Sequence, residues 1–158
     1  MPACRGAWVL VGLAAGACGG PPASVPAAVP YQDPGFVESG EYRLRYALTL
    51  TTDLPAEIAG SYGIDRRRNL ALLMLTLERR HAPPGRRVDA EALAAEAVAL
   101  TGERSALALT RHDDPGGPTW LAPVEARHRV PLTIEVRARA TPAGPDIRAR
   151  LTREFRLE

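Results

Sequence analysis

The sequence predicts an all-β domain of antiparallel strands, and three features support that prediction. Residues 130–141 and 147–157 each alternate apolar and polar side chains with a period of two, which is typical of strands with one buried face. Between them, residues 142–145 are Pro-Ala-Gly-Pro, which predicts a hairpin loop. Residues 70–77 are apolar on both faces, which indicates a central strand covered on both sides. Only Arg153 interrupts the inward-facing set of the last strand.

Residues 1–17 predict a signal peptide. Arg5 is the only charged residue before an apolar run at 7–15, which is too short to span a membrane as a helix but fits the hydrophobic region of an export signal. The small residues at 15–17 satisfy ordinary signal peptidase. Residues 15–18, Ala-Gly-Ala-Cys, also resemble a bacterial lipobox, whose cysteine is acylated and becomes the new N-terminus, although Ala15 stands where Leu is usual.

Cysteine usage favours the lipobox. Cys4 would leave with the signal peptide, so Cys18 would be the single thiol of the mature chain, with no partner for a disulfide. We therefore expect a lipoprotein that is anchored to a membrane through the lipid on Cys18 and faces the periplasm. Gly19 follows the cysteine in place of an inner-membrane retention Asp, so the outer membrane is favoured over the inner membrane. A soluble periplasmic protein is the alternative.

A Pro- and Gly-rich tether is predicted at 18–37. Residues 19–37 contain five Pro and three Gly, which sustain neither a helix nor a strand ladder. The remaining residues, 38–158, are expected to form one domain, which is long enough for a single sizeable core.

A strand and a short helix are expected at the start of that domain. The pattern of residues 41–52 predicts the strand, with five apolar side chains on one face and both of its tyrosines in the core: Tyr42, Leu44, Tyr46, Leu48 and Leu50. Asp53 as the capping residue and Pro55 in the first turn predict one short helix near 55–62, ending by Gly63.

The segment 88–100 is ambiguous. Its Ala, Glu and Leu residues favour a helix by propensity, while its imperfect alternation also permits a strand. The residues alone leave the two alternatives open.

Several short motifs make the chain resemble a family of exported bacterial proteins. They are Gly40-Glu41-Tyr42, residues 54–59, Tyr62-Gly63-Ile64 with Arg66, the apolar strand 69–77, Leu100-x-Gly102, Leu107, Trp120 with Ala122, Leu132-x-Ile134-x-Val136, and Phe155. On these residues the chain is similar to the family catalogued as domain of unknown function 4426. The resemblance implies a small β-sandwich of the immunoglobulin-like kind, with 88–100 a strand and with no assigned activity.

Catalytic and cofactor motifs are absent from the sequence, which has no Cys-x-x-Cys, His-Glu-x-x-His, Gly-x-Gly-x-x-Gly or P-loop pattern. Its three histidines, His81, His112 and His128, show no metal-ligand spacing. The polar run 112–114 precedes a Pro-Gly-Gly-Pro segment and predicts a solvated loop. We therefore expect no catalytic residue, no cofactor and no metal.

A non-enzymatic, periplasm-facing binding or interaction module is the function that these observations favour, with an envelope protein as its partner. Its recognition could use a sheet edge, by addition of a strand from the partner. One alternative is a small envelope hydrolase that uses Ser61, His112 and Asp113. The other is a structural envelope component without a ligand.

Candidate binding residues are the triplet Arg66, Arg67 and Arg68 and the aromatic Trp120. Arginine suits carboxylate or phosphate ligands, although all twenty basic residues of this chain are Arg and solvated strand ends are the simpler interpretation. A second basic pair, 79–80, falls at the other end of the central strand, roughly 36 Å away. Trp120 could border a groove, but a core position is preferred. The net charge of +2, without interleaved aromatic residues, argues against nucleic acid as a partner.

Overall fold

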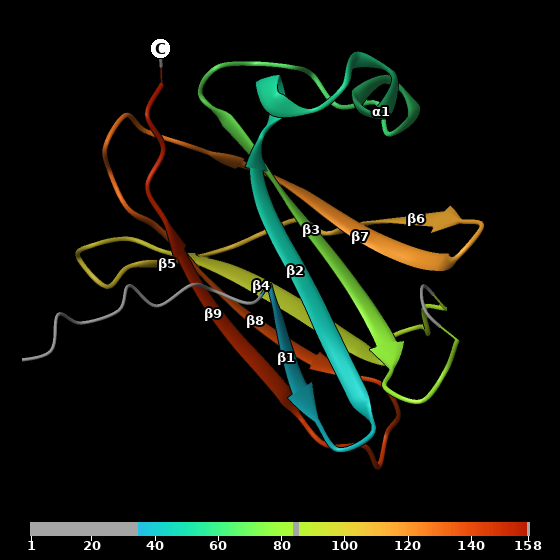
Figure 1. The fold of residues 1–158 in the computed structure, drawn as a ribbon. Coiled ribbons are helices and arrows are strands. Elements are labelled where there is room, and N and C mark those ends of the chain that lie inside the picture. The colour runs from blue at the N-terminus through green and yellow to red at the C-terminus, as the bar shows by residue number, and fades with distance from the viewer. Residues whose placement is uncertain (1–34, 84–85, 158) are drawn as a thin grey trace, which may run out of the picture. The chain divides into compact units, whose positions relative to one another are not determined.

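A computed structural model describes residues 35–83 and 86–157, so the predicted signal peptide, Cys18 and most of the tether lie outside the described residues. Two antiparallel sheets form an all-β sandwich, as the sequence and the resemblance predicted (Figure 1). Sheet A has the order β1-β2-β3-β7-β6: Phe36–Ser39, Tyr42–Leu50, Leu70–Arg79, Gly117–Glu125 and Thr110–Asp114. Sheet B has the order β5-β4-β8-β9: Arg104–Ala106, Ala92–Val98, Leu132–Arg139 and Ile147–Arg153.

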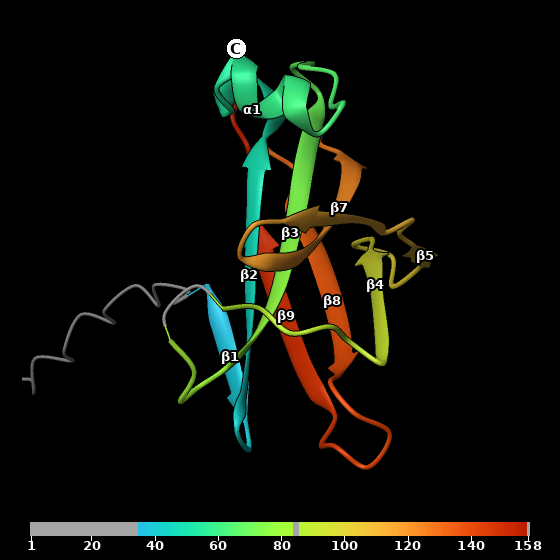
Figure 2. The ribbon, with the colours of Figure 1, turned by 90° about the vertical axis from the view of Figure 1, so that its right-hand side faces the viewer.

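The strand order follows the immunoglobulin arrangement. If β1 and the short β5 are set aside, sheet A has the order β2-β3-β7-β6 and sheet B has the order β4-β8-β9. These orders correspond to strands A-B-E-D and C-F-G of an immunoglobulin domain, with β5 beside the C strand. The chain crosses between the sheets after β3, β5 and β7, so the sandwich is closed by several connections (Figure 2).

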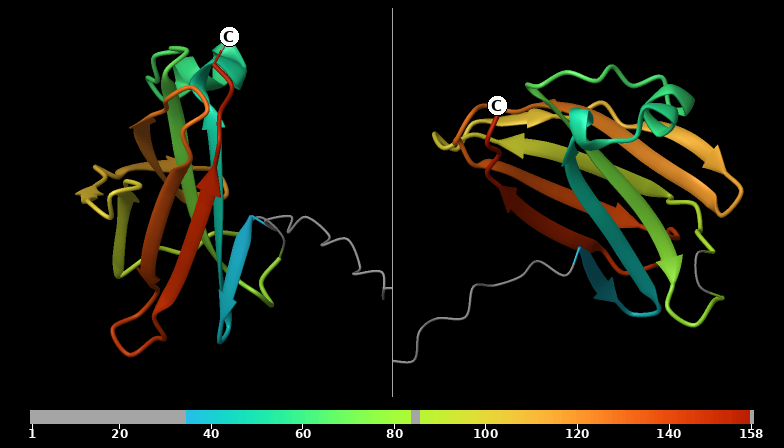
Figure 3. Two further views of the ribbon diagram at one scale, coloured as in Figure 1. Left: turned by 90° about the vertical axis from the view of Figure 1, so that its left-hand side faces the viewer. Right: turned by 45° about the horizontal axis from the view of Figure 1, so that its top comes forward.

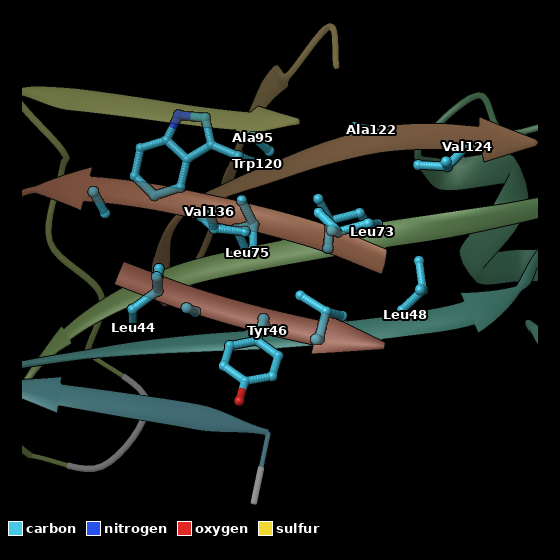
Figure 4. Packing of buried hydrophobic residues seen from close by; sticks show 14 of the residues in the cluster. Leu44, Tyr46, Leu48, Leu73, Leu75, Ala95, Trp120, Ala122, Val124 and Val136 are labelled. Atoms are coloured by element: carbon cyan, nitrogen blue, oxygen red, sulfur yellow. The ribbon is translucent and has the colours of Figure 1, made fainter. Parts of the chain in front are cut away.

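The core lies between the inner faces of the two sheets. Figure 4 shows the Trp120 indole among aliphatic side chains from both sheets. Leu73 and Leu75 of the central strand are 0% exposed, as is Ile134 of β8. A fully buried aliphatic side chain of this size contributes about 1.5–3 kcal/mol, so this layer is the main source of stability. Tyr42 and Tyr46 are buried in the same layer, as predicted.

The predicted C-terminal hairpin is present as β8 and β9. Their register pairs inward residues with inward residues, for example Ile134 with Leu151. Arg153, which interrupts the pattern, has specific partners: its Nη1 donates to the Leu48 carbonyl oxygen over 2.7 Å, and its guanidinium lies 5.7 Å from the centre of the Phe155 ring. The departure from alternation therefore ties the end of β9 to β2 in the other sheet.

The ambiguous segment 88–100 contains a strand, β4, which confirms the expectation taken from the family resemblance. β4 pairs with β8 along its whole length and with β5 at its C-terminal end. Ala95 is buried against the core, whereas Glu96 points outward, so tertiary pairing decides a segment whose propensities favour a helix.

Two segments expected to be irregular contain strands. The run 112–114 is not a loop but belongs to β6, which forms a hairpin with β7 through Pro115 and Gly116. β6 is an edge strand, so its outward polar side chains stay solvated while its backbone pairs. Phe36 and Val37, the last two residues of the predicted tether, belong to β1, where Val37 pairs with Leu44.

The short helix α1, Ala56–Ser61, lies where the sequence predicted it. The strand expected over 41–52 ends at Leu50, and a 3-10 turn, η1, Thr51–Asp53, follows it. The expected cap at Asp53 is wrong, since Pro55 occupies the N-cap position and no side chain caps the helix. Figure 3 shows α1 on the side of sheet A away from sheet B. No helix in the described ranges is long and apolar enough to cross a membrane.

Candidate functional site

The predicted triplet 66–68 lies in the connection between α1 and β3, and its three residues have different surroundings. Arg66 donates from Nη2 to the Thr52 carbonyl oxygen over 2.6 Å, which fastens the connection to the 3-10 turn. The backbone of Arg67 exchanges two hydrogen bonds with the buried Thr51 hydroxyl, at 2.9 and 3.0 Å. These contacts make the first two residues of the triplet part of the local scaffold.

Arg68 is the member of the triplet that lines an open hollow. This hollow has a volume of about 400 Å³, and the side chains around it include Asp53, Arg156 and Leu157 near the C-terminal end of the domain. The second basic pair is far from it, because Arg79 ends β3 at the opposite end of the strand. The structure therefore separates the two basic groups, as the sequence indicated.

Trp120 lies in the core. Its side chain is 7% exposed and packs with the buried cluster between the sheets (Figure 4). This is the position preferred from the sequence, and it leaves the indole unable to border a surface groove.

The three residues of the alternative hydrolase site have separate partners. The Ser61 hydroxyl donates to the Ile58 carbonyl oxygen within α1 over 2.9 Å. His112 packs edge-on against Tyr62, with 5.1 Å between ring centroids. Asp113 forms an ion pair with Arg111 at 2.9 Å and, as the next residue along β6, points to the opposite face from His112. The described residues contain no hydrogen bond that links these three side chains.

A polar cluster that the sequence analysis missed lies on the outer face of sheet A. Asp114 of β6 accepts three hydrogen bonds on the same oxygen, Oδ2: from Arg87 Nη1 at 2.7 Å, from the Thr119 hydroxyl at 2.7 Å and from the Tyr62 hydroxyl at 3.0 Å. Arg87 also contacts the Thr119 hydroxyl directly. Tyr62 follows the C-terminal end of α1, Arg87 lies in the β3–β4 connection, and the other two residues belong to β6 and β7. The cluster therefore fastens the α1–β3 and β3–β4 connections to sheet A.

The cluster holds Asp114 as a carboxylate. Burial opposes ionisation, but the hydrogen bonds from Thr119, Arg87 and Tyr62 outweigh it and lower the pKa of Asp114 below its ordinary value. Burial and the hydrogen bond to Asp114 raise the pKa of Tyr62. A carboxylate whose pKa is lowered and which already accepts three hydrogen bonds is a poor general base, so this arrangement suits a structural role.

Metal ligation has no support in the described part of the chain, where no three His, Cys, Asp or Glu side chains are grouped to hold an ion. His128 is engaged elsewhere, since its Nδ1 lies 3.0 Å from both the backbone nitrogen and the carbonyl oxygen of Leu157.

An apolar groove of about 650 Å³ lies at one end of the sandwich. The β4–β5 hairpin forms one side, and the end of β7 with the connection to β8 forms the other. Its lining includes Leu100, Leu107, Pro123, Val124 and Val130, together with Glu103, Glu125 and Arg127.

Exposed apolar side chains are concentrated in this groove. The described residues contain three exposed large hydrophobic side chains, and two of them, Leu100 at 77% and Val130 at 38%, line the groove; Ile58 on α1 is the third. Sequence reasoning found Leu100 only as part of a family motif, because a single Leu in a hairpin carries no sign of its exposure.

Comparison with known proteins identifies the family. The family described as Domain of unknown function (DUF4426) matches residues 36–157. The crystal structure of a DUF4426 family protein from Pseudomonas aeruginosa PAO1 has a TM-score of 0.62 and 20% identity, covering 78% of this chain and 94% of that one. A copper-bound form of FetP from uropathogenic Escherichia coli strain F11 has a TM-score of 0.49 and 12% identity, covering 74% and 92%. No curated protein sequence matches significantly.

Proposed function

We propose, for a chain that belongs to the DUF4426 family of domains of unknown function, that it is an exported lipoprotein whose periplasm-facing domain binds an extended peptide segment of an envelope protein. The lipid on Cys18 would hold the domain at a membrane, with the outer membrane favoured, and residues 18–37 would give it reach. The domain would act by binding and not by catalysis.

The observation that carries this proposal is the apolar groove beside β5, a strand that pairs along only one of its edges within the described residues. An exposed apolar patch within a groove is typical of a recognition surface. Leu100 and Val130 provide such a patch at opposite sides of the groove, while Glu125 and Arg127 add polar groups at its border. A peptide with apolar side chains at alternate positions fits this distribution.

The edge strand β5 supplies the hydrogen bonds that such a peptide needs. β5 pairs with β4 alone among the described strands. Glu103 and Leu107 bond to the β4 side through their backbones, so alternation directs the backbone groups of Arg104 and Ala106 outward. An extended peptide could therefore pair with this edge and place its side chains in the groove.

Peptide binding is tested with the purified full chain and a panel of fluorescent heptapeptides that alternate Val and Thr or Leu and Ser. We expect saturable changes in anisotropy for the wild type. Leu100→Arg should weaken binding at least tenfold, because it places a charge in the apolar groove. Ile58→Arg is the matched control, since it changes an exposed apolar residue that lies outside the groove.

A second variant separates the edge from the groove. Ala106→Pro removes an outward N–H while leaving the bonds between β5 and β4, so it should also weaken peptide binding. Binding that is absent from the wild type, or that falls equally with Ile58→Arg, contradicts the proposal.

Lipidation is tested by intact-mass spectrometry of the protein from membrane fractions of its own host. We expect a mass that begins at Cys18 and includes acyl chains, and we expect Cys18→Ser to move the protein to the soluble fraction. An unmodified mass would exclude the anchor and leave the soluble periplasmic alternative.

A further inference from the structure

The outer face of sheet B carries a hollow lined by three arginines. Arg137 on β8 lies directly opposite Arg148 on β9, and Arg150 lies two residues further along the same face of β9. These side chains and Glu135 line a hollow of about 210 Å³. Figure 3 shows that none of the described helices lies over this side of the sandwich.

An acidic pair on the same face has a counter-ion within the domain. Glu96 and Glu135 lie directly opposite each other on β4 and β8, an arrangement that destabilises a sheet if it has no counter-ion. Arg104 supplies that counter-ion, because its Nη1 lies 3.1 Å from Glu96 Oε2 and 2.6 Å from Glu135 Oε2. The two glutamates therefore share one internal counter-ion, which reduces the repulsion between them.

The basic pair lacks a comparable partner. Arg137 has no carboxylate oxygen within 4 Å in the described part of the chain. Arg148 lies 4.0 Å from Asp146, and the two side chains are 73% and 60% exposed. Arg150 lies 3.8 Å from Glu135, which Arg104 already holds at the shorter distance of 2.6 Å. An excess of positive charge thus remains at the hollow.

We propose that this hollow binds the phosphate group of a soluble phosphorylated ligand. Guanidinium groups recognise phosphate bidentately, and three of them on two strands match the several oxygens of a tetrahedral dianion better than the two oxygens of a carboxylate. Glu135 also lines the hollow and opposes an anion there, but it shares Arg104 with Glu96 and is outnumbered by the three arginines. The phosphate would supply the counter-charge that the Arg137–Arg148 pair lacks.

The remaining charged residues on the outer face of sheet B favour a discrete phosphorylated ligand over an anionic membrane surface. Arg104 is paired with two glutamates, and Arg139 lies 4.0 Å from Asp146. On the outer face of sheet B the unbalanced charge is therefore confined to one small hollow, whereas attraction to an anionic bilayer grows with the number of unpaired basic residues near its surface. The site is separate from the peptide groove and does not depend on the proposed peptide binding.

Calorimetric titration of the purified full chain with inorganic phosphate at fixed ionic strength tests the proposal. We expect saturable binding at one site, at least tenfold weaker with Arg137→Gln or Arg148→Gln. Arg45→Gln is the matched control, because it removes the same charge from a strand on the outer face of sheet A. Arg148 is exposed and faces a like charge, so Arg148→Gln should melt at an unchanged or higher temperature while it loses phosphate binding.

Four results would overturn the proposal. The first is a wild type that shows no saturable binding of phosphate, and the second is an equal loss of affinity with Arg45→Gln. The third is acetate binding as tightly as phosphate, which would remove the selectivity. The fourth is binding to phosphatidylglycerol vesicles without any response to free phosphate, which would assign the arginines to a lipid surface instead.

Discussion

The two sheets of this sandwich bury similar inner faces but have very different outer faces. On sheet A, Leu72 and Leu121 point away from the core and are nevertheless only 1% exposed, on the face that carries α1. On sheet B, the corresponding outward positions include Arg137 and Arg148, which are exposed to solvent. The outer face of sheet A is thus covered around Leu72 and Leu121, although Arg45 of β2 stays exposed on it, and the outer face of sheet B is open at its arginines.

The difference between the two outer faces predicts which substitutions affect stability and which affect ligand binding. Groups on the covered face of sheet A have fixed partners that shield one another from water, so removing one leaves another unsatisfied. Groups on the open face of sheet B can turn to water when a neighbour is lost. Substitutions should therefore reduce stability on sheet A and change ligand binding on sheet B.

The sharpest test of the covered face is Gly117→Ala, for which we expect the largest loss of stability. Gly117 has φ +111°, and an added Cβ would lie 2.8 Å from the Arg87 carbonyl oxygen. Backbone strain of this kind costs about 1–3 kcal/mol, and the clash also displaces the arginine that holds Asp114. Urea unfolding of both proteins measures the difference.

Gly102→Ala is the matched control for that substitution. Its φ is +87°, but an added Cβ would meet no atom within 4 Å. It should therefore show only the backbone cost of a Cβ at positive φ, about 1–2 kcal/mol. Equal losses at the two glycines would mean that the contact with Arg87 does not constrain the β6–β7 hairpin.

Asp114→Asn tests the polar cluster and should have the next largest effect. The amide keeps the shape of the side chain but removes the charge that pairs with the half-buried Arg87, at a cost of about 1–2 kcal/mol. Asp113→Asn is its control, because Asp113 is 68% exposed and pairs with Arg111 on the open side of the same strand. Its loss should stay below about 0.5 kcal/mol.

The stability difference between the wild type and Asp114→Asn should depend on pH, and its sign follows from the pKa of Asp114. The pKa of Asp114 is lower in the folded protein than its ordinary value of 3.8, so the folded state favours the carboxylate. The stabilisation is fully present above about pH 5 and is lost as the pH falls through the folded pKa. Denaturation of wild type and Asp114→Asn from pH 3 to pH 7 should therefore show stabilities that converge at acid pH. A constant difference would exclude ionisation of Asp114 as the cause.

How far the sequence predicts the structure differs from strand to strand. Alternation of apolar and polar residues locates β2 in sheet A and β8 and β9 in sheet B, because each of these strands has one buried and one more exposed face. In β7 the alternation is lost, because Leu121 and Thr119 are buried on its outer side, and neither β7 nor β6 was predicted.

Sites depend on contacts between distant residues, which a single sequence does not show. Tyr62 and Asp114 are 52 positions apart, and only the fold brings the hydroxyl to the carboxylate. The Arg66–Arg68 triplet, by contrast, was visible in the sequence because its charges are adjacent, yet two of its members serve the local scaffold. Adjacent charges are therefore easy to find in a sequence, but their role depends on the groups that the fold brings next to them.

Arg104→Gln tests the open face, where we expect the smallest effect. The change leaves Glu96 opposite Glu135 without the arginine that lies between them, so the melting temperature at pH 7 should fall slightly, and by less than with Asp114→Asn. The hydrogen bond from Arg104 lowers the pKa of Glu135 in the wild type, so this contribution should disappear as the pH falls and the carboxylates become protonated. Added salt should reduce it as well. Arg148→Gln should show no such loss, and if both variants melted at equally reduced temperatures, the basic pair would have an internal partner and the contrast with the acidic pair would be wrong.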